Sequence, residues 1–330
     1  MNKIIITNKL AVIIKHIRQY IIYKQQLKLI QARKIHQTPQ QEINDISNMF
    51  KLNAKETHIN TSYQGRISNN IKVGFGIETR MNTINNDQYS MKGIFNNNIL
   101  LNSFGIITKN NKRILKGEFL LNQINGYAEY KSPTEGIIYE GEWNKGYMHG
   151  IGIEKGAYGF NYSGEFIKGR KQGIGVITES NGNKYYGEVS YNCYHGYGIY
   201  QMDNEGVFMG QFEMNRKNGY GEFVKGNTMY IGFWVNDLKQ GFGIEINKDD
   251  GVAKVGYWKK DKLWGVAKVE FHNKGQMPIM GLWKDGCINK QMDDDEFLDV
   301  IHQTYCDKYI KYFNRNYNGI VDYCDQLLKQ

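Results

Sequence analysis

The chain has 330 residues, of which 13% are aromatic, 37 are glycine and only 3 are proline. This aromatic content excludes a disordered chain, and no apolar stretch approaches the roughly 18 residues that a membrane-spanning helix needs. The formal net charge is +9, and the four cysteines form no Cys-x-x-Cys pair. The cysteines therefore predict a reduced, cytoplasmic protein without a disulfide framework or a zinc site.

The basic charge is concentrated in residues 1–41, which carry eight Lys or Arg and no acid. Residues 9–36 lack Gly and Pro and place apolar side chains at helical spacing, so we expect a basic amphipathic helix. Its apolar stripe is formed by Leu10, Ile13, Ile14, Ile17 and Ile21. We expect this helix to cover the open edge of the sheet that is predicted for the following residues.

Other roles of the N-terminal helix stay open. One alternative is contact with an anionic membrane or an acidic partner. A calmodulin-class partner at 9–36 and a mitochondrial presequence are further interpretations. The cationic residues available for contact with lipid or an acidic partner are Lys15, Arg18, Lys24, Lys28, Arg33 and Lys34. Residues 42–60 follow as a polar linker.

Residues 61–292 consist of repeats. A Tyr-x-Gly-x-Trp-like start, with Gly, Asn or Asp seven residues after the Tyr, recurs ten times at intervals of 22–28 residues, and eight of these repeats also have glycine at eleven residues. We number positions from the first residue of each repeat, so that Tyr139, Gly141 and Trp143 occupy positions 0, 2 and 4. The ten repeats begin at Tyr63, Met91, Leu115, Tyr139, Tyr162, Tyr185, Phe208, Tyr230, Lys254 and Ile279.

Each position has a structural interpretation. Positions 0, 2 and 4 alternate with period two, so they share one face of a β-strand. Position 7 is always Gly, Asn or Asp, which tolerate positive φ and indicate a tight hairpin turn. Positions 11 and 13 are expected to share a face of the returning strand. Each repeat is therefore predicted to be a β-hairpin, in which glycine leaves room for a ring from a neighbouring strand.

These residues resemble the MORN repeat (membrane occupation and recognition nexus), whose pattern is Tyr-x-Gly-x-Trp/Phe-x-x-Gly-x-x-x-Gly-x-Gly. The match is best from Tyr139 to Gly243, whereas the repeats that begin at Met91, Lys254 and Ile279 depart from it. The resemblance implies a mainly β fold, an elongated twisted antiparallel sheet of consecutive hairpins, here with N- and C-terminal helices. It also implies scaffolding or membrane-associated roles, commonly at cytoskeletal and ciliary structures.

Residues 293–330 are predicted to form a C-terminal helical cap with a net charge of −4. The acids at 293–296 precede an apolar stripe that starts at Phe297 and Leu298, which is typical of a helix start. Covering the last strand of the sheet is the expected role of this segment. A calcium site is disfavoured, because four adjacent acids do not converge on one ion.

Enzyme motifs are absent from the sequence. It contains no Gly-Lys-Ser/Thr phosphate loop, no His-Glu-x-x-His and no Gly-x-Ser-x-Gly, and the repeat explains its Gly-x-Gly pairs. We therefore expect a non-catalytic scaffold with no cofactor, no metal and no nucleic-acid partner, which holds proteins in a cytoskeletal or ciliary assembly. A peripheral tether on anionic phospholipid is the alternative. The expected partner-binding surface is an exposed face of rings at Tyr139, Trp143, Tyr162, Phe166, Tyr185, Phe212, Tyr230 and Trp234.

Overall fold

The computed structural model describes residues 59–84, 86–100, 103–132, 136–272, 276–305, 309, 312, 313, 315 and 318–322. The helix predicted at 9–36 and almost all of the linker predicted at 42–60 lie outside these residues. The described residues belong to two compact units. We call residues 59–192 the N-terminal unit and residues 193–322 the C-terminal unit.

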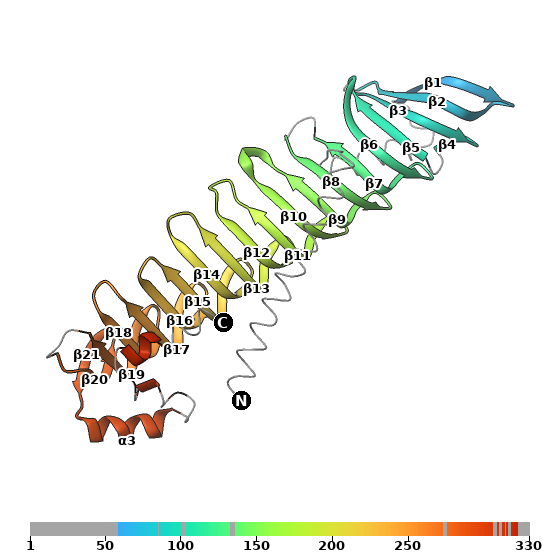
Figure 1. Cartoon of the computed structure of the whole chain (residues 1–330). Coiled ribbons are helices and arrows are strands. Elements are labelled where there is room, and N and C mark those ends of the chain that lie inside the picture. Colours follow the sequence, from blue (N-terminus) through green and yellow to red (C-terminus); the bar gives the residue numbers. More distant parts are fainter. Residues whose placement is uncertain are drawn as a thin grey trace. The chain divides into compact units, whose positions relative to one another are not determined.

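The N-terminal unit is built from antiparallel strands, each paired with a strand close to it in the chain (Figure 1). A short 3-10 turn, η1 (Ala157–Gly159), lies before the tenth strand. The strands are β1 (Ile59–Ser68), β2 (Ile71–Asn82), β3 (Gln88–Asn96), β4 (Ile99–Leu100), β5 (Ser103–Lys109), β6 (Lys112–Leu120), β7 (Gln123–Lys131), β8 (Ile138–Asn144), β9 (Tyr147–Lys155), β10 (Asn161–Ile167), β11 (Arg170–Thr178) and β12 (Lys184–Ser190).

The C-terminal unit continues the same pattern, since each strand pairs antiparallel with the next one along the chain. The helix α3 (Asp294–Thr304) follows the last strand. The strands are β13 (Cys193–Met202), β14 (Gly206–Glu213), β15 (Arg216–Lys225), β16 (Thr228–Val235), β17 (Leu238–Asn247), β18 (Val252–Lys259), β19 (Lys262–Phe271), β20 (Ile279–Lys284) and β21 (Cys287–Gln291). The predicted fold class, a mainly β protein of consecutive antiparallel hairpins with a helix at the C-terminal end, is confirmed.

The turns take the form that the sequence predicts. Positions 6 and 7 both have positive φ in all ten repeats, as at Asn236 (φ 49°) and Asp237 (φ 69°), which is the type I′ turn of two-residue hairpins. The side chain of Asp237 also accepts a hydrogen bond from the backbone N–H of Lys217 at 2.8 Å. Asp261 accepts one from the N–H of Lys239 at 2.7 Å. A short polar residue at position 7 thus suits the turn and also binds the preceding hairpin.

The glycine at position 11 belongs to a bulge. In seven hairpins the strand register shifts directly after the glycine at position 2, as between Gly141 and Trp143. Gly150, at position 11 of that repeat, has a φ of 59°, and all eight glycines at this position have positive φ. Side chains rarely adopt this conformation, so glycine is favoured there. The regular alternation expected through positions 11 and 13 is therefore interrupted.

The rings at positions 0 and 4 form the core, and the prediction that they are an exposed contact face is wrong. The ring of Tyr139 lies flat across Gly141 and its cross-strand partner Gly152, so that a Cβ on either glycine would collide with the ring. The ring comes from the same strand as Gly141 and not from a neighbouring strand as expected. All eight predicted contact rings are only 0–4% exposed, namely Tyr139, Trp143, Tyr162, Phe166, Tyr185, Phe212, Tyr230 and Trp234.

Edge-to-face contacts join the rings of successive repeats into what we call the ring ladder. Tyr230 meets Trp234 of its own repeat at 5.1 Å between ring centroids, and Trp258 of the next repeat at 5.5 Å. In the N-terminal unit, Tyr139 meets Phe166 of the following repeat at 4.9 Å. Such pairs are worth about 0.5–1.5 kcal/mol beyond the burial of their area. Each repeat therefore completes the core of its neighbour.

Lysine side chains at position 9 help to shield the ring ladder from water. The Nζ atom of Lys239 lies 4.9 Å from the ring centroids of both Tyr230 and Trp258, and it also pairs with Glu245. Lys217 has its Nζ atom 4.8 Å from the ring centroid of Trp234, and burial lowers the pKa of this ammonium group. The aliphatic stems cover the rings, and the ammonium groups interact with the ring faces.

Candidate binding groove

The face of the sheet opposite the ring ladder carries positions 3 and 12. Position 3 alternates with the rings along its strand, and it is the direct antiparallel partner of position 12 in the preceding repeat, so both point to one side. We call this side the position-3/12 face. In the C-terminal unit its pairs are apolar over the last repeats: Tyr220 with Phe233, Phe242 with Tyr257, and Val266 with Leu282.

The C-terminal segment packs on this face. Helix α3 begins at the acids as predicted, because the side chain of Asp293 accepts a hydrogen bond from the backbone N–H of Glu296 at 2.9 Å. Phe297 and Ile301 of α3 are buried in one cluster with strand residues such as Val255. The expectation that this segment covers the last strand is corrected: it lies on the face of the sheet, and all five residues of β21 are exposed.

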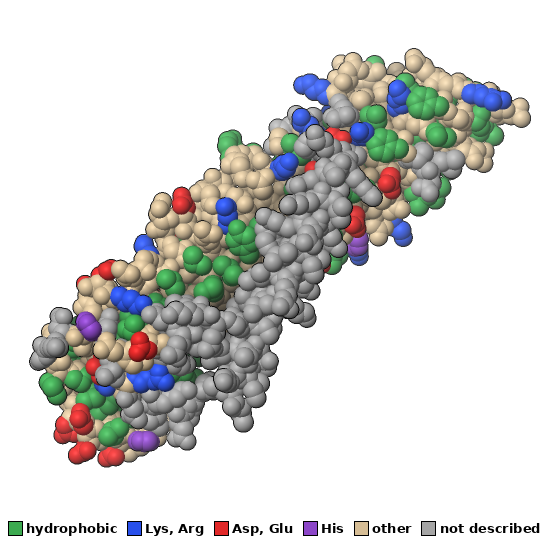
Figure 2. Space-filling view, viewed as in Figure 1, with side chains coloured by type: hydrophobic (Ala, Val, Ile, Leu, Met, Phe, Trp, Pro, Cys, Tyr) green, Lys and Arg blue, Asp and Glu red, His purple; other side chains and the backbone are tan. Residues whose placement is uncertain are grey.

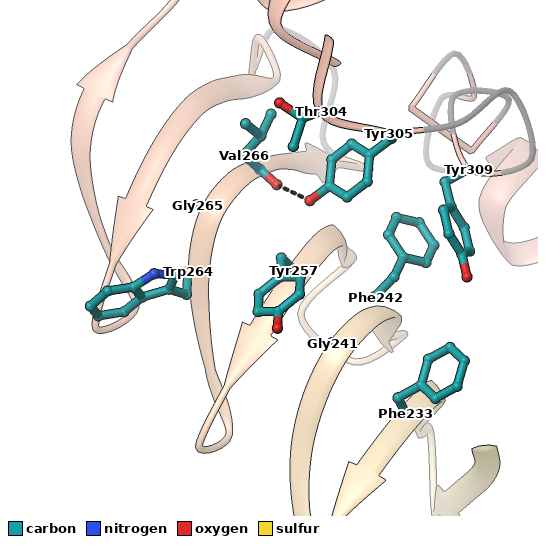
Figure 3. Close-up of a pocket in the computed structure, with 10 residues that line it drawn as sticks. All are labelled: Phe233, Gly241, Phe242, Tyr257, Trp264, Gly265, Val266, Thr304, Tyr305 and Tyr309. Atoms are coloured by element: carbon teal, nitrogen blue, oxygen red, sulfur yellow. Dashed lines mark hydrogen bonds between the residues drawn. The ribbon is translucent and has the colours of Figure 1, made fainter. Parts of the chain in front are cut away.

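An aromatic groove lies between the strands and the residues that follow α3 (Figure 3). Phe242 stacks on Tyr309 with ring centroids 4.3 Å apart, and Tyr305 donates a hydrogen bond to the carbonyl of Val266 at 3.0 Å. Phe233 and Tyr257 remain 38% and 37% exposed. The cavity has a volume of about 490 Å³ and is lined by Phe233, Gly241, Phe242, Tyr257, Trp264, Gly265, Val266, Thr304, Tyr305 and Tyr309.

The lining of the groove is uncharged, and a lysine lies beside it. The lining contains no acidic and no basic side chain. At its rim, the Nζ atom of Lys259 lies 4.0 Å from the ring centroid of Trp264. Lys259 is exposed and has no ion pair within the described residues. The groove can therefore take an apolar side chain, while its rim favours a negative charge.

Tyr305 makes the attachment of the C-terminal segment sensitive to pH. Burial raises the pKa of the Tyr305 phenol above its usual value of 10.0. A raised folded pKa contributes stability below pH 10, and that stability is lost as the pH rises through the folded pKa. We expect the free energy of unfolding to fall between pH 9 and pH 11, by up to about 1.4 kcal/mol per pH unit for one group. The Tyr305→Phe variant should show a smaller fall. Urea denaturation at pH 9 and at pH 11 measures the free energy of unfolding of both proteins. An equal fall in both would show that the Tyr305 phenol does not cause the pH dependence.

The groove was not predicted from the sequence, although one repeat position signals it. The signal is position 3, which is Glu in four successive repeats of the N-terminal unit and becomes aromatic at Phe233 and Tyr257. A change from a run of acidic residues to aromatic residues at one repeat position indicates a covered or contacting surface. The cationic residues predicted to contact lipid or an acidic partner, Lys15, Arg18, Lys24, Lys28, Arg33 and Lys34, lie outside the described residues.

Within the described residues, no group of three or more His, Cys, Asp or Glu side chains is placed to hold a metal ion. No helix in the described part of the chain has the length and hydropathy needed to cross a membrane.

At the start of the position-3/12 face, Phe75, Ile94 and Phe104 are 47–63% exposed. Figure 2 shows hydrophobic side chains at the surface over β1–β6.

Comparison with known families supports the repeat. A family model described as the MORN repeat matches residues 63–82, 139–157, 162–184, 208–228 and 230–252. These five segments begin at position 0 of five of the ten repeats, so the count of ten MORN units stays a prediction. No curated protein matches the chain.

Proposed function

Because the chain carries repeats of the MORN family, we propose that it is a non-catalytic scaffold that binds a partner protein through the aromatic groove of the C-terminal unit. MORN repeats mediate contacts with proteins or membranes, which agrees with an interaction role. The observation that carries the proposal is the exposure of Phe233 and Tyr257 on the position-3/12 face, while the ring ladder is buried. A cytoskeletal or ciliary assembly is the setting that we infer from the MORN resemblance.

The chemistry of the groove defines the partner. Its aromatic lining suits an aliphatic or aromatic side chain, and Lys259 at the rim, which forms no ion pair among the described residues, suits an acid beside it. We therefore propose a partner segment in which an apolar residue is flanked by Asp or Glu. Interface hot spots commonly consist of such a buried apolar anchor with a charged neighbour at the rim.

A displayed peptide library tests this function on the full chain. Selected peptides should carry an apolar residue next to an acid, and Tyr257→Ala should weaken their binding about tenfold or more. Tyr158→Ala is the matched control, because Tyr158 is 92% exposed and lies in the N-terminal unit, outside the groove. Peptides that bind the wild type and both variants equally would show that the groove is not the contact site.

A peripheral tether on anionic phospholipid is the second candidate. The eight Lys or Arg and the absence of acids in residues 1–41 favour it, since each cation near an anionic surface contributes about 1 kcal/mol. A tether of this kind should sediment with phosphatidylserine vesicles at low salt and be released at high salt. Failure to sediment in either condition would remove this candidate and leave the groove proposal untouched.

A further inference from the structure

The position-3/12 face of the N-terminal unit combines acidic and apolar residues. Four successive position-3 residues are glutamates, and each pairs across strands with an apolar residue of the preceding repeat. The pairs are Glu118 with Phe104, Glu142 with Tyr127, Glu165 with Ile151 and Glu188 with Ile174. Directly paired residues on antiparallel strands share one face. The face therefore presents a row of carboxylates beside a row of apolar side chains.

Three of these carboxylates are available for a basic partner. Glu118, Glu142 and Glu165 are exposed, and within the described residues none of them forms an ion pair. One oxygen of Glu165 accepts a long hydrogen bond of 3.4 Å from the backbone N–H of Ile174. Successive carboxylates are two strands apart, which is about 9.6 Å in an antiparallel sheet.

The C-terminal unit provides a precedent within the same chain. There the last three pairs at positions 3 and 12 are apolar on both sides, and an apolar segment packs against strands β16–β20 on that face. Thus an apolar part of the face is covered by an apolar segment of the same chain. In the N-terminal unit the matching segment has to be basic as well as amphipathic.

We propose that residues 15–36 of this chain are that segment, lying along the acidic part of the position-3/12 face over β6–β12. This range carries Lys15, Arg18, Lys24, Lys28, Arg33 and Lys34 and no acid, beside apolar residues of its own. On a helix, Lys24 and Lys28 would lie about one turn apart on the same side as Ile17 and Ile21. Cations and apolar residues would then face the sheet together, as its carboxylates and apolar residues require.

The connecting chain is long enough. Residues 37–58 separate this segment from β1, and such a stretch can span about 70 Å when extended. From β1 to β9 the paired strands make about seven steps, or about 35 Å. This arrangement neutralises the cations of the segment within the protein, so it competes with the binding of these cations to a lipid surface.

Hydrogen exchange on the full chain tests the proposal. The backbone amides of residues 15–36 should exchange slowly, and Glu142→Lys with Glu165→Lys should accelerate them about tenfold or more, because two attractions become repulsions. Adding Lys24→Glu and Lys28→Glu to the same chain should restore slow exchange. The amides of β8 and β10 report whether the sheet stays folded in each variant.

The control is Glu205→Lys with Glu213→Lys, which makes the same change in net charge at exposed residues of the C-terminal unit. Equal exchange of residues 15–36 in the two reversal variants would overturn the proposal. Protection that depends on phosphatidylserine vesicles would assign the segment to lipid, and protection that rises with protein concentration would assign it to a second copy. Either result would also contradict the binding of residues 15–36 to the position-3/12 face of the same molecule. The proposed function of the aromatic groove would be unaffected by either result.

Discussion

Replacing Trp258 by alanine is expected to lower the free energy of unfolding by about 3–5 kcal/mol, because a large buried ring leaves a cavity in the ring ladder. Trp258 is 2% exposed. Its ring contacts Tyr230, and its indole N–H donates to the carbonyl of Gly243 at 3.1 Å. The loss therefore combines apolar burial, a ring contact and a buried hydrogen bond. Urea denaturation followed by tryptophan fluorescence measures it.

Trp264→Ala is the matched control, since it removes the same side chain from the opposite face of the same unit. Trp264 lines the aromatic groove and is only half-buried. We expect a cost of about 1 kcal/mol or less, together with weaker binding of peptides that occupy the groove. Similar losses of stability from both substitutions would contradict the assignment of one face to the core and the other to binding.

Gly152→Ala is expected to destabilise the N-terminal unit by about 2–3 kcal/mol, because an added Cβ collides with the Tyr139 ring. The chain contains its own comparison. Where alanine occupies position 13, at Ala128 and Ala267, position 0 of the repeat is Leu115 or Lys254 and not an aromatic ring. In these two repeats, therefore, alanine occurs at position 13 where position 0 has no aromatic ring.

A double-mutant cycle with Tyr139→Leu measures this coupling. Tyr139→Leu alone should also be destabilising, since it removes a fully buried ring from the ladder. Combined with Gly152→Ala, it should cost less than the sum of the two single changes by about 1 kcal/mol or more. Additive costs would mean that the ring does not determine the need for glycine.

Much of the fold is predictable from the sequence, because each repeat encodes its local geometry in a few residue types. Glycine, Asn and Asp at position 7 predict the hairpin turn, and the residue at this position has positive φ in every repeat. The alternation of Tyr139, Gly141 and Trp143 defines one strand face, and the paired glycines explain how a ring packs on it. The acids before Phe297 mark the start of α3.

The side on which contacts occur was harder to predict. Period-two alternation shows that two faces differ, but it does not say which face becomes the core. Rings at position 0, such as Tyr139 and Tyr230, are buried because each covers a glycine pair and meets a ring of the next repeat. This is a property of neighbouring hairpins and not of one strand. The bulge at Gly150 interrupts the expected alternation on the returning strand. The groove also needs Tyr305 and Tyr309, which are distant in sequence from Phe242.

Hydroxyl-radical footprinting of the full chain tests the central claim most directly, because it reports the solvent exposure of each tyrosine. The claim predicts fast oxidation at Tyr158 and Tyr191, which are 92% and 64% exposed, and intermediate oxidation at Tyr257 in the groove. It predicts protection of the ladder residues Tyr139, Tyr162, Tyr185 and Tyr230, which are all 0% exposed. Oxidation of these four at the rate of Tyr158, with Tyr257 protected, would contradict it.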